Sequence, residues 1–134
     1  MSNQISNNES VLTRRYPSND LRNIIFEDIN DKISRGKMSH LIVLIMRDNG
    51  YVNATKLCRE SGKEFEEWYQ SELAKEYVKL VGEDVGVSVE SLRIEVEDGE
   101  EELRGTYVHP KLIVILAMWA DVEYALFVGK IMSK

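Results

Sequence analysis

The chain has 134 residues, of which 43% are hydrophobic, so it can bury one core of the size usual for a single domain. Its longest apolar run, residues 112–120, is too short to cross a bilayer and lacks the basic segment and cleavage site of a signal peptide. One cysteine and two histidines suit neither an internal disulfide nor a zinc site. We therefore expect an intracellular protein without a membrane segment, a metal or a cofactor.

The net charge of −6 is unevenly distributed along the chain. Residues 1–59 carry 9 basic and 6 acidic side chains, whereas residues 83–102 carry 1 basic and 9 acidic ones. A nucleic-acid-binding domain usually has a basic surplus, because neutralising phosphates and releasing counterions supplies most of its non-specific affinity. Composition alone therefore gives no support for a nucleic-acid partner.

The first part of the chain predicts a flexible tail, a helix and a hairpin. Residues 1–17 are rich in serine and asparagine and have few large apolar side chains to offset the entropy of ordering, so the domain is expected to span residues 18–134. Aliphatic residues at three- and four-residue intervals predict an amphipathic helix near 20–34, which ends at Arg35-Gly36-Lys37. The β-branched run 40–46, followed by Asp48-Asn49-Gly50, predicts a hairpin near 41–53.

The middle of the chain predicts two helices joined by a glycine turn. Asn53 can cap a helix over 54–60, because its side-chain oxygen can accept a hydrogen bond from a free backbone amide one turn later. Ser61-Gly62 ends this helix, and a second one is expected near 63–81. Its inward face would comprise Phe65, Trp68, Tyr69, Leu73, Tyr77 and Leu80. This is the layout of a helix-turn-helix, which many unrelated helical corners share.

The last third predicts a second hairpin and two more helices. Alternating apolar residues and a turn at Asp98-Gly99 predict a hairpin near 91–108, which would be a wing behind the helix-turn-helix. Pro110 can open a helix over 110–120 that is apolar on every side, and Asp121 can cap a helix over 122–132. Trp119 is assigned to the core, where replacement by alanine would cost about 3–5 kcal/mol.

These elements predict the fold class: α+β, a compact single domain with a helix-turn-helix-like core, two small β-hairpins and a buried C-terminal helical pair. The sequence contains no glycine-rich phosphate loop, nucleophile elbow or usefully spaced Cys/His pair, so no catalytic residues are expected. His109 is interpreted as a helix cap or core-edge residue, and Cys58 as a small buried hydrophobe. From the residues alone, the chain is a small binding module whose ligand the pattern does not name.

Two blocks of the chain resemble the KilA-N domain of large DNA viruses and phages, which is related to the fungal APSES DNA-binding domain. The first, MRDNGYVNATKLCRESGKEFEEW, covers residues 46–68, and the second, GTYVHPKLIVILAMWADVEYALFVGKIM, covers residues 105–132. The resemblance implies a compact α+β fold with a helix-turn-helix-like core and double-stranded DNA as the partner. It also implies a place in the host cytoplasm or at a viral replication site, and in viral proteins often a further C-terminal domain such as a RING finger.

The chain departs from the family pattern in its charges. Glu64, Glu66 and Glu67 fall where lysines are frequent in viral members, Gln70 replaces a basic residue, and the wing is acidic, which is repulsive and costly against phosphates. DNA contacts would then use the polar side chains of the two middle helices: Lys56, Arg59, Lys63, Gln70, Lys75 and Lys79. The alternative is a protein-interaction module that keeps the fold, has lost the basic face, and binds a basic protein through the acidic hairpin.

Overall fold

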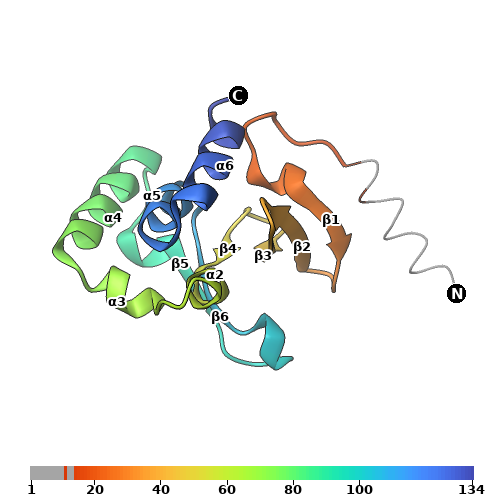
Figure 1. The fold of residues 1–134 in the computed structure, drawn as a ribbon, viewed down its shortest axis with the longest axis horizontal. Coiled ribbons are helices and arrows are strands. Elements are labelled where there is room, and N and C mark those ends of the chain that lie inside the picture. The colour runs from red at the N-terminus through yellow and green to blue at the C-terminus, as the bar shows by residue number, and fades with distance from the viewer. Residues whose placement is uncertain (1–10, 12–13) are drawn as a thin grey trace, which may run out of the picture.

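Among the described residues, antiparallel pairing joins six strands into one sheet, in the order β1-β2-β3-β4-β6-β5 (Figure 1). The computed structural model describes Val11 and residues 14–134. The strands are β1 (Ile25–Asp28), β2 (Ile33–Met38), β3 (Leu41–Met46), β4 (Val52–Asn53), β5 (Arg93–Val96) and β6 (Gly105–Val108). The α-helices are α2 (Ala54–Glu60), α3 (Phe65–Tyr69), α4 (Glu72–Val85), α5 (Pro110–Ala120) and α6 (Val122–Met132). The predicted α+β class is confirmed.

The helix predicted near 20–34 is wrong: this segment forms the 3-10 helix η1 (Leu21–Ile24) and the hairpin β1–β2. The Asn30 side chain makes the turn, because its oxygen accepts from the backbone amides of Lys32 and Ile33 at 2.8 Å each. Gly36 lies inside β2 rather than at a helix end. A Cβ there would lie 2.8 Å from Ile45 Cδ1 and 2.9 Å from Ile24 Cγ1, so the strand needs glycine where these side chains cross it.

Both predicted hairpins are confirmed. Strands β3 and β4 pair through Ile45 and Val52, and Gly50 has a φ of 78° in the connecting turn. Strand β3 also pairs along its whole length with β2, a partner that the sequence did not predict. Strands β5 and β6 form the second hairpin, and the loop between them contains the 3-10 helix η3 (Glu101–Leu103) and protrudes from the domain (Figure 1).

Helix α2 has the predicted bounds, but the helix predicted near 63–81 is divided into α3 and α4. The break falls at Ser71, whose hydroxyl accepts from the Ala74 amide at 3.2 Å and so caps α4. The break also changes which residues point inward: Ala74, Val78 and Val81 are buried on α4, while the predicted Leu73 and Leu80 are 68% and 55% exposed. Phe65 and Trp68 of α3 are buried as predicted.

The two C-terminal helices have the predicted bounds. Pro110 stands at the start of α5, and Asp121 caps α6 by accepting from the Glu123 amide at 2.8 Å. Helix α5 is buried on most of its surface, whereas Val122 and Leu126 of α6 are exposed. The core assignment of Trp119 is corrected to partial burial, because it packs at the edge of the core.

The sheet has an apolar cluster on each of its faces. Leu41, Val43 and Ile45 of β3 join the large core that α2, α4, α5 and α6 complete. Leu44, between them in sequence, points to the other face and packs with Ile33, Leu103 and Tyr107 in a smaller cluster. In the described part of the chain no α-helix contributes to this smaller cluster. The two faces therefore have different coverings, helices on one and the β5–β6 loop on the other.

The flexible tail predicted over 1–17 falls largely on residues 1–10 and 12–13, which lie outside the described residues. Residues 14–17 are described and contact the domain. Both terminal nitrogens of Arg14 donate to the Asp28 carboxylate, at 2.9 and 3.0 Å, and the Arg22 guanidinium lies 4.4 Å from the centre of the Tyr16 ring.

Candidate nucleic-acid interface

A polar joint fixes helix α2 against strand β6. The Asn53 oxygen accepts from the Lys56 amide at 2.9 Å, as predicted for a helix cap, and its Nδ2 donates to the Arg104 carbonyl at 3.1 Å. The Thr106 amide donates to Thr55 Oγ1 at 2.9 Å. Because Asn53, Ala54 and Leu57 are buried, α2 has its inner face anchored on the sheet and its outer face free to meet a ligand.

The outer face of α2 carries two of the predicted cations. Lys56 Nζ lies 3.4 Å from a Glu60 carboxylate oxygen, and Arg59 Nε lies 3.6 Å from one of Glu64. Both glutamates are at least 46% exposed, and Arg59 is 65% exposed. Exposed pairs of this length contribute little, about 0–1 kcal/mol, so the two cations can exchange these carboxylates for another anion.

Lys63, in the turn after α2, is engaged within the protein. Its Nζ donates to the Trp119 carbonyl at 3.3 Å and lies 5.1 Å from the centre of the Trp119 ring. This lysine links the α2–α3 turn to α5. Lys56, Arg59 and Lys63 are thus gathered on α2 and its C-terminal turn.

The remaining predicted residues lie on other helices. Lys75 and Lys79 are exposed one turn apart on α4, beside the exposed Leu73. Gln70 is exposed at the C-terminal end of α3. Helix α3 packs on both α2 and α4 and lies between them (Figure 1). The structure therefore brings the predicted residues together as two groups of cations with Gln70 between them.

Arg93 of β5 connects the acidic helix α3 to the second hairpin, and the sequence analysis did not select it. Its guanidinium donates to Glu66 at 2.7 Å and to Glu95 at 2.8 Å, and lies 4.4 Å from the centre of the Tyr69 ring. Burial alone would lower the pKa of Arg93, but the hydrogen bonds to Glu66 and Glu95 outweigh it and raise the pKa. In the sequence, Arg93 stands out as the one basic residue within the acidic segment 83–102, and this position could have marked it as an ion-pair partner.

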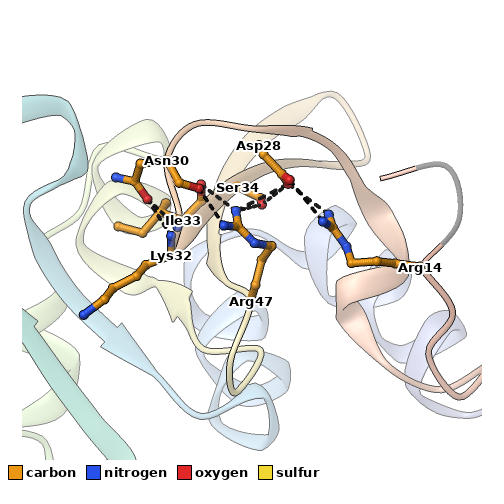
Figure 2. Close-up of polar contacts among 7 residues, drawn as sticks. All are labelled: Arg14, Asp28, Asn30, Lys32, Ile33, Ser34 and Arg47. Atoms are coloured by element: carbon orange, nitrogen blue, oxygen red, sulfur yellow. Dashed lines mark hydrogen bonds and ion pairs between the residues drawn. The ribbon is translucent and has the colours of Figure 1, made fainter. Parts of the chain in front are cut away.

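A second cluster that the sequence analysis missed holds the N-terminal hairpin together (Figure 2). The Asp28 side chain is 4% exposed and accepts hydrogen bonds from Arg14 and from Ser34 Oγ. It also forms an ion pair with Arg47, whose Nη1 lies 3.4 Å from the carboxylate. Arg47 also donates to the carbonyls of Asn30 and Ile33, at 2.6 and 3.2 Å. These two arginines are therefore committed to the fold and are not part of the exposed basic surface.

The acidic hairpin is only partly neutralised. Arg35 of β2 donates to Glu102 and to Glu27, and Arg93 forms an ion pair with Glu95. Exposed carboxylates without a hydrogen-bond or ion-pair partner among the described residues are Glu97, Asp98, Glu100 and Glu101. The hairpin thus keeps a negative surface in the folded protein.

His109 and Cys58 have the structural roles predicted for them. His109 Nδ1 accepts from the Lys111 amide at 3.0 Å, which makes it the cap of α5, and burial lowers its pKa. Cys58 is fully buried, and burial raises its pKa to about 12, so it remains a protonated thiol. In the described ranges no group of acidic, histidine or cysteine side chains could hold a metal ion. Within those ranges, too, every helix is too short or too polar to span a bilayer.

The architecture is that of a small α+β domain whose helices cover one face of an antiparallel sheet and present cations from α2 and α4. The family model of the KilA-N domain matches residues 36–134, so the chain belongs to the KilA-N family, as the resemblance indicated.

Three similar proteins come from large DNA viruses. The chain is 44% identical over 117 residues to KilA-N domain-containing protein L4 of Acanthamoeba polyphaga mimivirus, covering 87% of this chain and 26% of L4. It is 45% identical over 102 residues to protein L32 of the same virus, covering 75% of this chain and 27% of L32. With protein 006L of Invertebrate iridescent virus 6 the identity is 28% over 109 residues, covering 78% and 31%. The chain thus spans about a quarter to a third of these relatives. No solved structure matches it.

Proposed function

We propose that residues 18–134 form a non-enzymatic module that binds double-stranded DNA with little sequence preference. The observation that carries the proposal is the pair of cations on the outer face of α2, the partly exposed Lys56 and the exposed Arg59, on a helix that the Asn53 and Thr55 contacts fix on the sheet. Membership of the KilA-N family also supports the proposal, because this family is related to a DNA-binding domain.

In this proposal α2, the Gly62 turn and α3 act as the helix-turn-helix-like element. Lys56 and Arg59 contact phosphates, and Lys75 and Lys79 extend the contact along α4. Phosphate contacts position a protein on a duplex without reading its sequence. Gln70 is the one predicted site residue whose amide suits a base edge, so weak sequence preference is expected.

The surrounding carboxylates limit how the duplex can approach. Glu66 shares the single positive charge of Arg93 with Glu95, and Glu67 of α3 is exposed without a partner among the described residues. The wing-like hairpin keeps its exposed carboxylates, which repel phosphates. We therefore propose that DNA meets the outer face of α2 and that the hairpin tip stays away from the backbone. The viral relatives favour a host cytoplasm or viral replication site as the location.

The second candidate function is binding of a basic protein by a domain that has lost its DNA-binding face. The unpaired carboxylates of the hairpin favour it. Titrating a fluorescent duplex at about 50 and 200 mM salt separates the candidates, because phosphate contacts make the affinity fall steeply with salt. Absent or salt-independent binding at micromolar protein would favour the protein-binding function.

Charge reversal then tests the surface. Lys56→Glu with Arg59→Glu should flatten the salt slope by about two units, one for each lost phosphate contact, and leave the melting temperature unchanged. Lys37→Glu with Lys130→Glu is the matched control, because both lysines are exposed and have no ion pair in the described part of the chain. Equal effects of the two double variants would contradict the α2 assignment. Lys63→Glu is unsuitable here because it also breaks the Trp119 contact.

A further inference from the structure

The sheet face opposite the helices contains a groove. It has a volume of about 690 Å³, within the range of ligand pockets, and lies between the β1–β2 turn, the β3–β4 turn and the β5–β6 hairpin. Ile33, Met46, Ile94, Val96 and Leu103 form its apolar part. The groove is therefore an incompletely covered part of the smaller apolar cluster.

The apolar part of the groove presents side chains to solvent. Ile94 pairs with Tyr107 across the hairpin, so both side chains lie on the groove face of the sheet. Tyr107 is buried and donates to the Leu103 carbonyl at 2.7 Å, whereas Ile94 remains 36% exposed. Val96, two residues further on, shares this face and is partly exposed. Burying Ile94 and Val96 would stabilise a complex.

The rim of the groove is acidic. Five of its carboxylates are exposed and have no hydrogen-bond or ion-pair partner among the described residues: Asp31, Asp48, Glu97, Asp98 and Glu100. Lys32 is the one basic side chain among the described lining residues, and it points away from the Asp28 cluster (Figure 2). A phosphate-bearing ligand would be repelled here, whereas a cationic one would be attracted.

We propose that this groove docks a lysine- or arginine-rich peptide segment of a partner protein, which seats an apolar side chain on Ile94 and Val96. The acidic rim receives the cationic side chains on either side of that anchor. The groove and α2 belong to opposite faces of the sheet, so one domain can hold DNA on its helices and a basic protein in the groove.

The probe is a short fluorescein-labelled peptide in which lysines flank one leucine, titrated into the whole chain by anisotropy. Two further peptides, one with glutamate for lysine and one with alanine for leucine, test charge and anchor separately. Binding by the first peptide that weakens with salt is expected, with no binding by the glutamate peptide and several-fold weaker binding by the alanine peptide. Absence of binding at low salt, or equal binding of the leucine and alanine peptides, would overturn the proposal.

Variants locate the peptide. Asp31→Asn, Glu97→Gln and Asp98→Asn together should weaken binding about tenfold, the sum of three modest ion pairs. Glu67→Gln, Glu76→Gln and Glu83→Gln are the matched control, because they remove three exposed carboxylates from α3 and α4. A comparable loss in both triple variants would show non-specific charge attraction and refute the site.

The anchor has its own pair of variants. Ile94→Thr should weaken the peptide several-fold at unchanged charge, while Val122→Thr, at a 68% exposed position on α6, should not. Lys56→Glu with Arg59→Glu should leave peptide binding unaltered. A change in peptide affinity in this variant comparable to that of the groove triple variant would place the peptide on α2 and would overturn the groove assignment, even if DNA binding itself were established.

Discussion

Replacing Asp28 by asparagine tests the charge cluster that anchors the N-terminal hairpin. The substitution keeps the shape of the side chain but removes the one negative charge between Arg14 and Arg47 (Figure 2). Asparagine can accept with one oxygen, whereas the carboxylate now accepts two bonds from Arg14 and one from Ser34 Oγ at 2.7 Å. The change therefore leaves guanidinium donors facing an amide nitrogen.

The expected loss in the free energy of unfolding is about 2–3 kcal/mol. Removing one partner of a buried ion pair costs roughly 3–5 kcal/mol because the other charge stays buried and uncompensated. Here the aspartate is 4% exposed but Arg14 and Arg47 are 24% and 16% exposed, so water can partly solvate them and the loss falls below that range.

The loss should depend on pH. Burial alone would raise the pKa of Asp28, but hydrogen bonds from Arg14 and Ser34, with the charge of Arg47, outweigh burial and lower the pKa. A lowered pKa means that the carboxylate's contribution is fully present above the unfolded value of about 3.9 and is lost as the pH falls through the folded value. The difference between wild type and variant should thus shrink in acid.

Urea unfolding followed by tryptophan fluorescence, at neutral pH and at about pH 3, measures both quantities. Asp31→Asn is the control, since this aspartate lies in the same hairpin, is exposed and has no partner among the described residues, and its change should stay within about 0.5 kcal/mol. An Asp28→Asn loss no larger than the control's, or one that grows in acid, would refute the reasoning.

Two further stability predictions follow from the corrected fold. Trp119→Ala should cost about 2 kcal/mol in urea unfolding, less than the 3–5 kcal/mol of a fully buried aromatic, because the ring is only partly covered; a loss above about 4 kcal/mol would contradict its edge position. Gly105→Ala should cost at least about 2 kcal/mol, because Gly105 has a φ of 137° and a Cβ would lie 2.9 Å from Asn53 Oδ1; a change below about 0.5 kcal/mol would contradict this close approach.

Local chemistry predicted several elements correctly. Asn53, Pro110 and Asp121 act within one turn of themselves, so their capping roles could be inferred from neighbouring residues alone. The glycine turns at Gly50 and Gly99 also have the positive φ that their sequences indicate. Where the determining contact lies within a few residues, the sequence was sufficient.

The failures arose where a distant partner decides the structure. Isoleucines spaced four apart in 20–34 satisfy a helical pattern. The segment forms strands instead, because β2 pairs with β3 along its length. Only glycine fits at position 36, where the side chains of Ile24 and Ile45 leave no room for a Cβ. The break at Ser71 was missed because one serine in a helical pattern is a weak signal for a helix cap. The break places Ala74 rather than Leu73 on the inward face of α4. Arg93 was missed because its partners Glu66 and Tyr69 are far from it in the chain.

Several residues of the two blocks that resemble the family make contacts inside the domain rather than on its outer faces. In the first block Asn53 and Thr55 bind the backbone of β6 and its flanking loop, and in the second Tyr107 and His109 make contacts within the hairpin and the α5 cap. Such positions preserve the joint between sheet and helices whatever the domain binds. Charge on the outer faces can then change without loss of the fold, which is how a KilA-N domain can carry an acidic groove behind its basic helix.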